Sequence, residues 1–130
     1  MEMTYPDPFP VVLVRLSCLR AQVVSAHVKF QSQEKKRRAL LKKGVIRANK
    51  HLRAGRYLVL VYPQENGKRQ REYIGADPER IAHVQAGIER AGELDRLTEE
   101  NERWTLIMRK FADGVEALHA LLAEASSKGE

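Results

Sequence analysis

The apolar positions along the chain predict a mainly helical protein with one β-hairpin. After a proline-rich start, apolar residues recur in steps of four and three, which predicts a helix over 9–31 with one apolar face. The many β-branched residues of this segment leave a pair of strands as the alternative. Beyond it the apolar stripe becomes thin and cations cover the remaining surface. This predicts a second, basic helix over 33–54, bent or broken near Gly44 and stopped by Gly55.

A β-hairpin is predicted over 56–75, where two β-prone runs flank Asn66-Gly67. A two-residue Asn-Gly turn would place Pro63 where the strand pairing needs an N–H, and proline has none. We therefore expect a three-residue loop from Glu65 to Gly67, with Gly67 in the left-handed conformation.

The C-terminal part of the chain predicts a long helix over 78–125, capped by Asp77. Two successive steps of three around Gly92 predict a kink there, or a division into two helices. Further on, the apolar steps alternate three and four, which is typical of a helix that packs along its length against another. That partner is either the first helix, in an internal bundle, or a second copy, in a dimer. The predicted seam residues are Leu94, Leu97, Asn101, Trp104, Met108, Phe111, Val115, Leu118 and Leu122. The fold class expected for residues 1–130 is a single α+β domain, mainly helical.

Cationic side chains concentrate in one quarter of the chain. Between Lys29 and Arg56 there are eleven Lys and Arg residues and one acid, Glu34, although the whole chain has a formal net charge of only +6. A stretch of this density repels itself unless a polyanion or an acidic partner neutralises it. Solvated helix faces usually mix both signs. We therefore expect this segment to bind nucleic acid, DNA in preference to RNA.

The predicted contacts come from the basic helix and from the hairpin, where strand alternation places Arg69, Arg71 and Tyr73 on one face. Helix cations would hold phosphates, arginines on the hairpin would reach base edges, and tyrosines would stack on unpaired bases. The alternative for the tyrosines is that they cover the hairpin against the helices. The predicted contact residues are Lys35, Lys36, Arg37, Arg38, Lys42, Lys43, Arg47, Lys50, Arg53, Arg56, Lys68, Arg69, Arg71 and Tyr73.

No residue pattern identifies a reaction, so the sequence predicts a non-enzymatic accessory or regulatory protein. The four histidines are scattered, no glycine-rich phosphate loop occurs, and neither a metal nor a cofactor is expected. A two-carboxylate, metal-dependent nuclease stays an alternative, because carboxylates that meet only in space leave no signature in one sequence. Another alternative is an inhibitor or adaptor that docks on an acidic surface of a larger nucleic-acid machine.

We expect a cytoplasmic protein with no membrane contact. The apolar run from Val11 to Val14 is interrupted by Arg15 and Arg20, which argues against a signal peptide and against a membrane span. Cys18 is the single cysteine, and its spacing from neighbouring leucines predicts a buried thiol.

The run from Tyr57 to Tyr62, the Gly67-Lys68 turn, Tyr73-Ile74 and the leucine-rich helix after Pro78 resemble small domains of bacterial transposase- and mobile-element-associated proteins, over about residues 47–97. Members of that family carry a cysteine cluster before the hairpin, which this chain lacks, so the metal site of the family is not expected here. The hairpin is also similar to the arm-type DNA-binding domains of phage integrases, which have three strands where this sequence predicts two. Both resemblances imply a protein of a mobile element or a phage.

Overall fold

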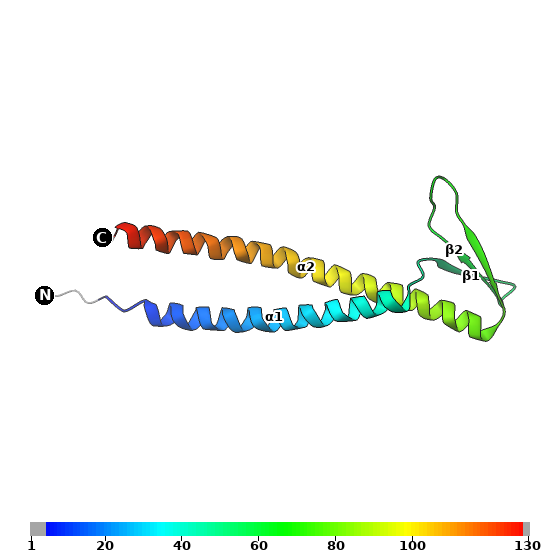
Figure 1. Ribbon diagram of the computed structural model, residues 1–130, viewed down its shortest axis with the longest axis horizontal. Coiled ribbons are helices and arrows are strands. Elements are labelled where there is room, and N and C mark those ends of the chain that lie inside the picture. Colours follow the sequence, from blue (N-terminus) through cyan, green and yellow to red (C-terminus); the bar gives the residue numbers. More distant parts are fainter. Residues whose placement is uncertain (1–4, 129–130) are drawn as a thin grey trace.

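The computed structural model describes residues 5–128 and shows two long antiparallel helices with a small sheet at one end (Figure 1). The free ends of both helices lie together at the opposite end. The predicted fold class, α+β and mainly helical, is confirmed. In chain order the elements are α1 (Phe9–Lys43), β1 (Asn49–Arg53), β2 (Tyr57–Val61), β3 (Arg71–Gly75) and α2 (Pro78–Lys128).

Helix α1 is one continuous helix where the sequence predicted a boundary near residue 32. It begins where the Asp7 carboxylate accepts a hydrogen bond from the Phe9 N–H at 3.0 Å. No glycine or proline follows Pro10 before Gly44, so nothing interrupts the helix. Gly44, with φ of +94°, ends it, and Arg90 of α2 donates to the Gly44 carbonyl at 2.7 Å. The separate helices predicted over 9–31 and 33–54 are therefore wrong.

The end of the predicted basic helix is a strand. Strand β1 pairs antiparallel with β2, with Arg53 opposite Tyr57. Ala54 and Gly55 turn the chain between the two strands with φ of +52° and +72°. Asparagine or glycine usually fills the first position of such a turn. Because alanine fills it here, this turn lacks the asparagine–glycine signal of a hairpin, and the prediction of two strands is corrected to three in the order β1-β2-β3.

The loop between β2 and β3 closes on the two-residue turn that the sequence analysis rejected. Asn66 and Gly67 have φ of +53° and +79°, and Glu65 and Lys68 exchange both backbone hydrogen bonds at 3.0 Å. The preferred three-residue loop is therefore wrong. Three residues separate the end of β2 from Glu65, whereas only two residues separate Lys68 from the start of β3. This irregularity keeps Pro63 outside the regular pairing, so its missing N–H costs no hydrogen bond.

One face of the sheet packs on the first turns of α2 and forms the core. Its buried residues are Leu58, Leu60, Ile74 and Val84, with Ile46, Ala48, Tyr62, Ile81 and Ile88 packed around them. The link between α1 and the sheet is fastened to α2, because the Ile46 N–H donates to the Gly87 carbonyl at 3.0 Å. A Cβ atom on Gly87 would lie 2.7 Å from Ile46 Cδ1. The close approach of this link to α2 therefore requires glycine at position 87.

Helix α2 is a single helix, so the alternative of two helices is wrong; Figure 1 shows it bending gently along its length. The predicted seam faces α1, but its burial decreases toward the free ends because the two helices diverge there (Figure 1). Leu94, Leu97 and Asn101 are buried, Trp104, Met108 and Phe111 are half-buried, and Val115, Leu118 and Leu122 are exposed. The internal helix pair therefore accounts for only the first two thirds of the seam.

The diverging segments are called the distal halves below: residues 9–30 of α1 and 104–128 of α2. Cys18 lies there and is exposed, so the predicted buried thiol is wrong. Within the described residues, α1 is the one helix long and apolar enough to cross a membrane by length and composition. Signal sequences near an N-terminus and core helices pass the same test. The prediction that the chain makes no membrane contact stays a prediction.

The two glycines of the sheet-proximal part of α2 provide a matched pair for the close approach at Ile46. We expect Gly87→Ala to lower the free energy of unfolding by about 1–2 kcal/mol, because the clash exceeds the gain in helix propensity. Gly92→Ala adds a Cβ with nothing within 4 Å, so it should stabilise by up to about 1 kcal/mol. Urea unfolding followed by circular dichroism measures both, and shifts of the same sign would contradict the packing described.

Candidate nucleic-acid interface

The sheet has an outer face that points away from α2. Strand pairing places Val59 opposite His51 on β1 and opposite Tyr73 on β3, and these side chains share one face because paired residues point the same way. By strand alternation, Arg53, Tyr57 and Arg71 lie on the same face. Its central residue, Val59, is buried between its neighbours, whereas His51, Arg53, Arg71 and Tyr73 are exposed. The full set, called the outer sheet face, is Asn49, His51, Arg53, Tyr57, Val59, Val61, Arg71 and Tyr73.

The charges of the sheet segregate between its two faces. Glu72 is paired with Leu60 and therefore lies on the inner face, where the Tyr62 hydroxyl donates to its carboxylate at 2.7 Å. That hydrogen bond raises the pKa of Tyr62 above its ordinary value. Glu65, the other acid of residues 49–75, lies in the β2–β3 turn. The outer sheet face therefore combines two arginines and a histidine with no carboxylate.

Two aromatic rings lie near each other on the outer sheet face. The ring centroids of Tyr57 and Tyr73 are 6.3 Å apart with an interplanar angle of 31°. The guanidinium carbon of Arg56 lies 5.1 Å from the centre of the Tyr57 ring, which is a cation–π contact. Tyr73 is 60% exposed. The alternative that the tyrosines cover the hairpin against the helices therefore applies to Tyr62 alone.

The arginines around these rings are available to a ligand. Within residues 5–128, no carboxylate lies within ion-pairing distance of Arg53, Arg56 or Arg71. The same is true of Lys50, Lys68 and Arg69 over the described part of the chain. Arg71 and Tyr73 share a face as predicted, whereas Arg69 lies outside β3 and beyond the alternation that would place it with them.

The exposed cations at the end of α1 lie on the side of the helix that faces away from α2. Their helical spacing places Lys35, Arg38 and Lys42 on one flank of α1 and Lys36 and Lys43 on another. All five are exposed. The predicted basic helix is therefore the end of α1, whose exposed side carries positive charge on two neighbouring flanks.

Two of the predicted contact residues hold the fold together. Arg37 faces α2, where it donates to Thr98 Oγ1 at 2.8 Å and forms an ion pair with Glu34 at 2.9 Å. Arg47 forms an ion pair with Asp95 at 2.6 Å. The Asp95 carboxylate raises the pKa of Arg47, and the pKa of Asp95 is lowered in return. These two arginines are therefore engaged in contacts within the fold, whereas the sequence predicted them to contact nucleic acid.

A polar cluster marks the place where α1 and α2 begin to diverge. Asn101, the polar residue of the predicted seam, is buried, and its side-chain amide donates to Glu34 at 2.8 Å. Gln33 is also buried, and its amide hydrogen-bonds to Glu100, which also pairs with Lys29 at 3.3 Å. Buried polar contacts of this kind penalise any slip of one helix along the other. They therefore fix the register of the helix pair.

Metal-ligating side chains are dispersed over the described part of the chain. Within residues 5–128, no group of three or more His, Cys, Asp or Glu side chains could hold a metal ion. Two cavities lie between the distal halves of the helices and are lined mainly by apolar side chains. The chemistry that the described residues offer is concentrated on the outer sheet face.

The predicted contact residues lack His51, because residues 49–53 are predicted to be helical, whereas Tyr57 is among the tyrosines predicted to stack on bases. In a helix, His51 and Arg53 point in different directions, whereas in a strand they share a face. Gly55, two residues after Arg53, was the local signal of a turn after this strand. No protein-family model, curated protein or solved structure matches the chain.

The polar cluster predicts a dependence of stability on pH. The Asn101 hydrogen bond, followed by the hydrogen bond and charge of Arg37, holds the pKa of Glu34 below its ordinary value of 4.5. A lowered pKa contributes stability that is present above pH 4.5 and is lost as the pH falls through the folded-state value. We expect Glu34→Gln to cost about 1 kcal/mol at pH 7, and the difference from wild type to shrink below pH 4.5. Urea unfolding across this pH range measures it, and a constant difference would contradict the cluster's ionic character.

Proposed function

We propose that the chain is a non-enzymatic nucleic-acid-binding protein and that the outer sheet face is its contact surface. The observation that carries the proposal is the arrangement of Arg53, Arg71 and His51 around Tyr57 and Tyr73 with no carboxylate on that face. Unpaired cations beside exposed aromatic rings suit a ligand that offers both phosphates and bases.

The dimensions of the sheet favour double-stranded DNA. Three strands spaced about 4.8 Å apart are roughly 10 Å across, and the major groove of DNA is roughly 12 Å wide. A-form RNA has a deep, narrow major groove that side chains do not read. In the groove, Arg53 and Arg71, on the outer strands β1 and β3, would contact phosphates or guanine edges. Because the cations lie on both sides of the central strand, they would hold both walls of the groove.

The cations at the end of α1 would have a supporting role. Lys42 and Lys43 end α1 only five residues before β1, so they lie near the sheet along the chain. Charges on two flanks of a helix attract a polyanion without fixing its orientation. The proposal therefore assigns orientation to the outer sheet face and general attraction to α1. The proposal also includes a cytoplasmic location. It further includes a role for a mobile element or a phage, which the resemblance implies.

Removing two arginines from the outer sheet face tests the proposal. Wild-type affinity for a short duplex should fall linearly on a log–log salt plot, and Arg53→Ala/Arg71→Ala should weaken binding and reduce the slope by about 2, because two phosphate contacts are lost. Fluorescence anisotropy over a series of salt concentrations measures both quantities.

The matched control is Arg103→Ala/Lys110→Ala, which removes two exposed cations of α2. This control should leave the slope unchanged. Equal losses in the two double variants would show that binding follows net charge and not the outer sheet face. Wild-type protein without salt-dependent binding to duplex would contradict nucleic-acid binding and favour the inhibitor or adaptor.

A further inference from the structure

The exposed apolar side chains of the molecule gather at one end. Of the nineteen large apolar side chains that are exposed, fifteen lie on the distal halves of α1 and α2. They range from 41% exposed at Leu19 to 69% at Phe9. Val14 and Leu16 point to different sides of α1 by helical period, and both are exposed. A helix that is apolar all round is normally buried, yet α2 covers only one side of α1.

The exposed apolar area on the distal halves is close to the area that each partner buries in a stable protein–protein interface. Complete burial of a Val or Leu side chain removes roughly 60–120 Å² from water, so fifteen half-exposed side chains offer on the order of 700 Å². The largest apolar patch of a typical monomer is about 300–600 Å², and a standard interface buries about 800 Å² on each partner.

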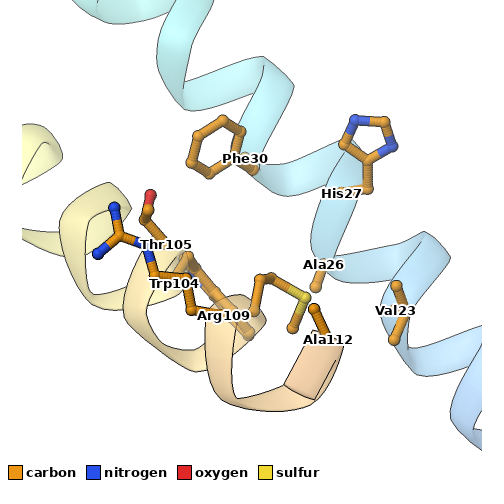
Figure 2. A pocket seen from close by; sticks show the side chains of 9 residues that line it. Val23, Ala26, His27, Phe30, Trp104, Thr105, Arg109 and Ala112 are labelled. Atoms are coloured by element: carbon orange, nitrogen blue, oxygen red, sulfur yellow. The ribbon is translucent and has the colours of Figure 1, made fainter. Parts of the chain in front are cut away.

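The space between the distal halves is hollow and lined by both helices. Figure 2 shows Phe30 and Ala26 of α1 and Trp104 and Ala112 of α2 around a cavity of about 530 Å³. A second hollow of about 670 Å³ follows toward the free ends, lined by residues that include Leu118. Native helix interfaces are close-packed, and these hollows leave their apolar lining without partner atoms. Side chains from further helices are needed to fill them.

We propose that the distal halves of two copies of this chain pack together as a four-helix bundle. Within residues 5–128, unpaired charges of both signs remain on the distal halves, Arg109 and Lys110 of α2 among them, and four others are complementary between copies. Arg15 and Arg20 of α1, and Asp113 and Glu116 of α2, have no ion-pair partner within residues 5–128. In a two-fold assembly, the two arginines of each copy would face the two acids of the other copy at the rim of the apolar surface. Two-fold symmetry would make this contact occur twice.

The charge of the sheet-proximal part of α1 sets the orientation of the two copies. In a parallel arrangement, the exposed cations of residues 35–43 would lie side by side with those of the second copy and repel them. An antiparallel arrangement overlaps only the distal halves and keeps these cations apart. Helix α2 has 51 residues and is therefore about 76 Å long, so the two sheets would be more than about 100 Å apart.

A lipid bilayer is the less suitable cover for this surface. Arg15 and Arg20 divide the apolar segment of α1, and each would cost about 2.5–3.5 kcal/mol at the centre of a bilayer. Helix α2 lies alongside and would carry Arg109, Asp113 and Glu116 to the same depth. A second copy satisfies these charges, whereas hydrocarbon does not.

Light scattering coupled to size exclusion tests the association on the full chain. Wild type should have the mass of a dimer at micromolar concentrations. Leu16→Glu and Leu121→Glu, which place a carboxylate on each distal half, should each have the mass of a monomer and keep the helical circular dichroism of the wild type. Leu41→Glu is the matched control, because Leu41 is equally exposed at 54% but lies outside the distal halves, and it should remain a dimer. A monomeric wild type, or a chain that floats with phosphatidylcholine vesicles as a monomer, would overturn the proposal.

The orientation has its own test. In a Cys18→Ser background, Lys68→Cys places a single spin label at the tip of the hairpin. The antiparallel dimer puts the two labels beyond the range of double electron–electron resonance, whereas a label on the native Cys18 of each copy gives a measurable distance. A measurable distance between the Lys68→Cys labels would overturn the antiparallel arrangement.

Discussion

The arrangement of this molecule depends on a sheet of which only one face is covered. A three-stranded sheet must bury one face to be stable, and the Leu58, Leu60 and Ile74 side chains bury theirs on the first turns of α2. The contact between Ile46 and Gly87 holds the sheet close to that helix. Everything on the opposite face is then directed to solvent. The polar and aromatic residues of the outer sheet face are exposed because of this packing.

The strand register also keeps acidic side chains away from the outer sheet face. Glu72 lies on the buried side of β3 and is held there by the Tyr62 hydroxyl, which itself packs at the edge of the core. An odd shift of the β3 register would exchange Glu72 with its neighbours and place a carboxylate beside the arginines. The register of the sheet, and not its composition alone, therefore determines the positive charge of the outer face.

The two ends of the helix pair differ in how completely their apolar side chains are covered. At the sheet end, the helix pair is closed by Leu94 and Leu97 and by the buried contact between Asn101 and Glu34. Beyond this polar cluster, the same heptad pattern continues on α2, but α1 covers Trp104, Met108 and Phe111 only in part and leaves Val115, Leu118 and Leu122 exposed. The heptad pattern of α2 is therefore longer than the segment that packs closely against α1 of the same chain. The uncovered apolar positions are the physical basis for a second copy at that end.

Helix α2 and the β2–β3 hairpin could be predicted from the sequence because they depend on local signals: the heptad steps after Leu94, the Asp77-Pro78 start and the Asn66-Gly67 turn. Strand β1 could not, because Ala54 hides the turn that follows it and its pairing with β2 is a tertiary contact. The site was found in part. Arg53, Arg71, Tyr57 and Tyr73 were named from charge and aromatic content, but their neighbour His51 required the register. The ion pairs of Arg37 and Arg47 join residues of α1 and its link to α2, and no local pattern shows them.

The most direct test is to follow the backbone amide resonances of the isotope-labelled chain by NMR during titration with a short DNA duplex. The account predicts shifts that concentrate on His51, Arg53, Tyr57, Arg71 and Tyr73, with smaller changes at the end of α1. The inner-face residues and the distal halves should be unaffected. Shifts confined to residues 35–43, or no shifts at physiological salt, would contradict the assignment of the outer sheet face as the contact surface.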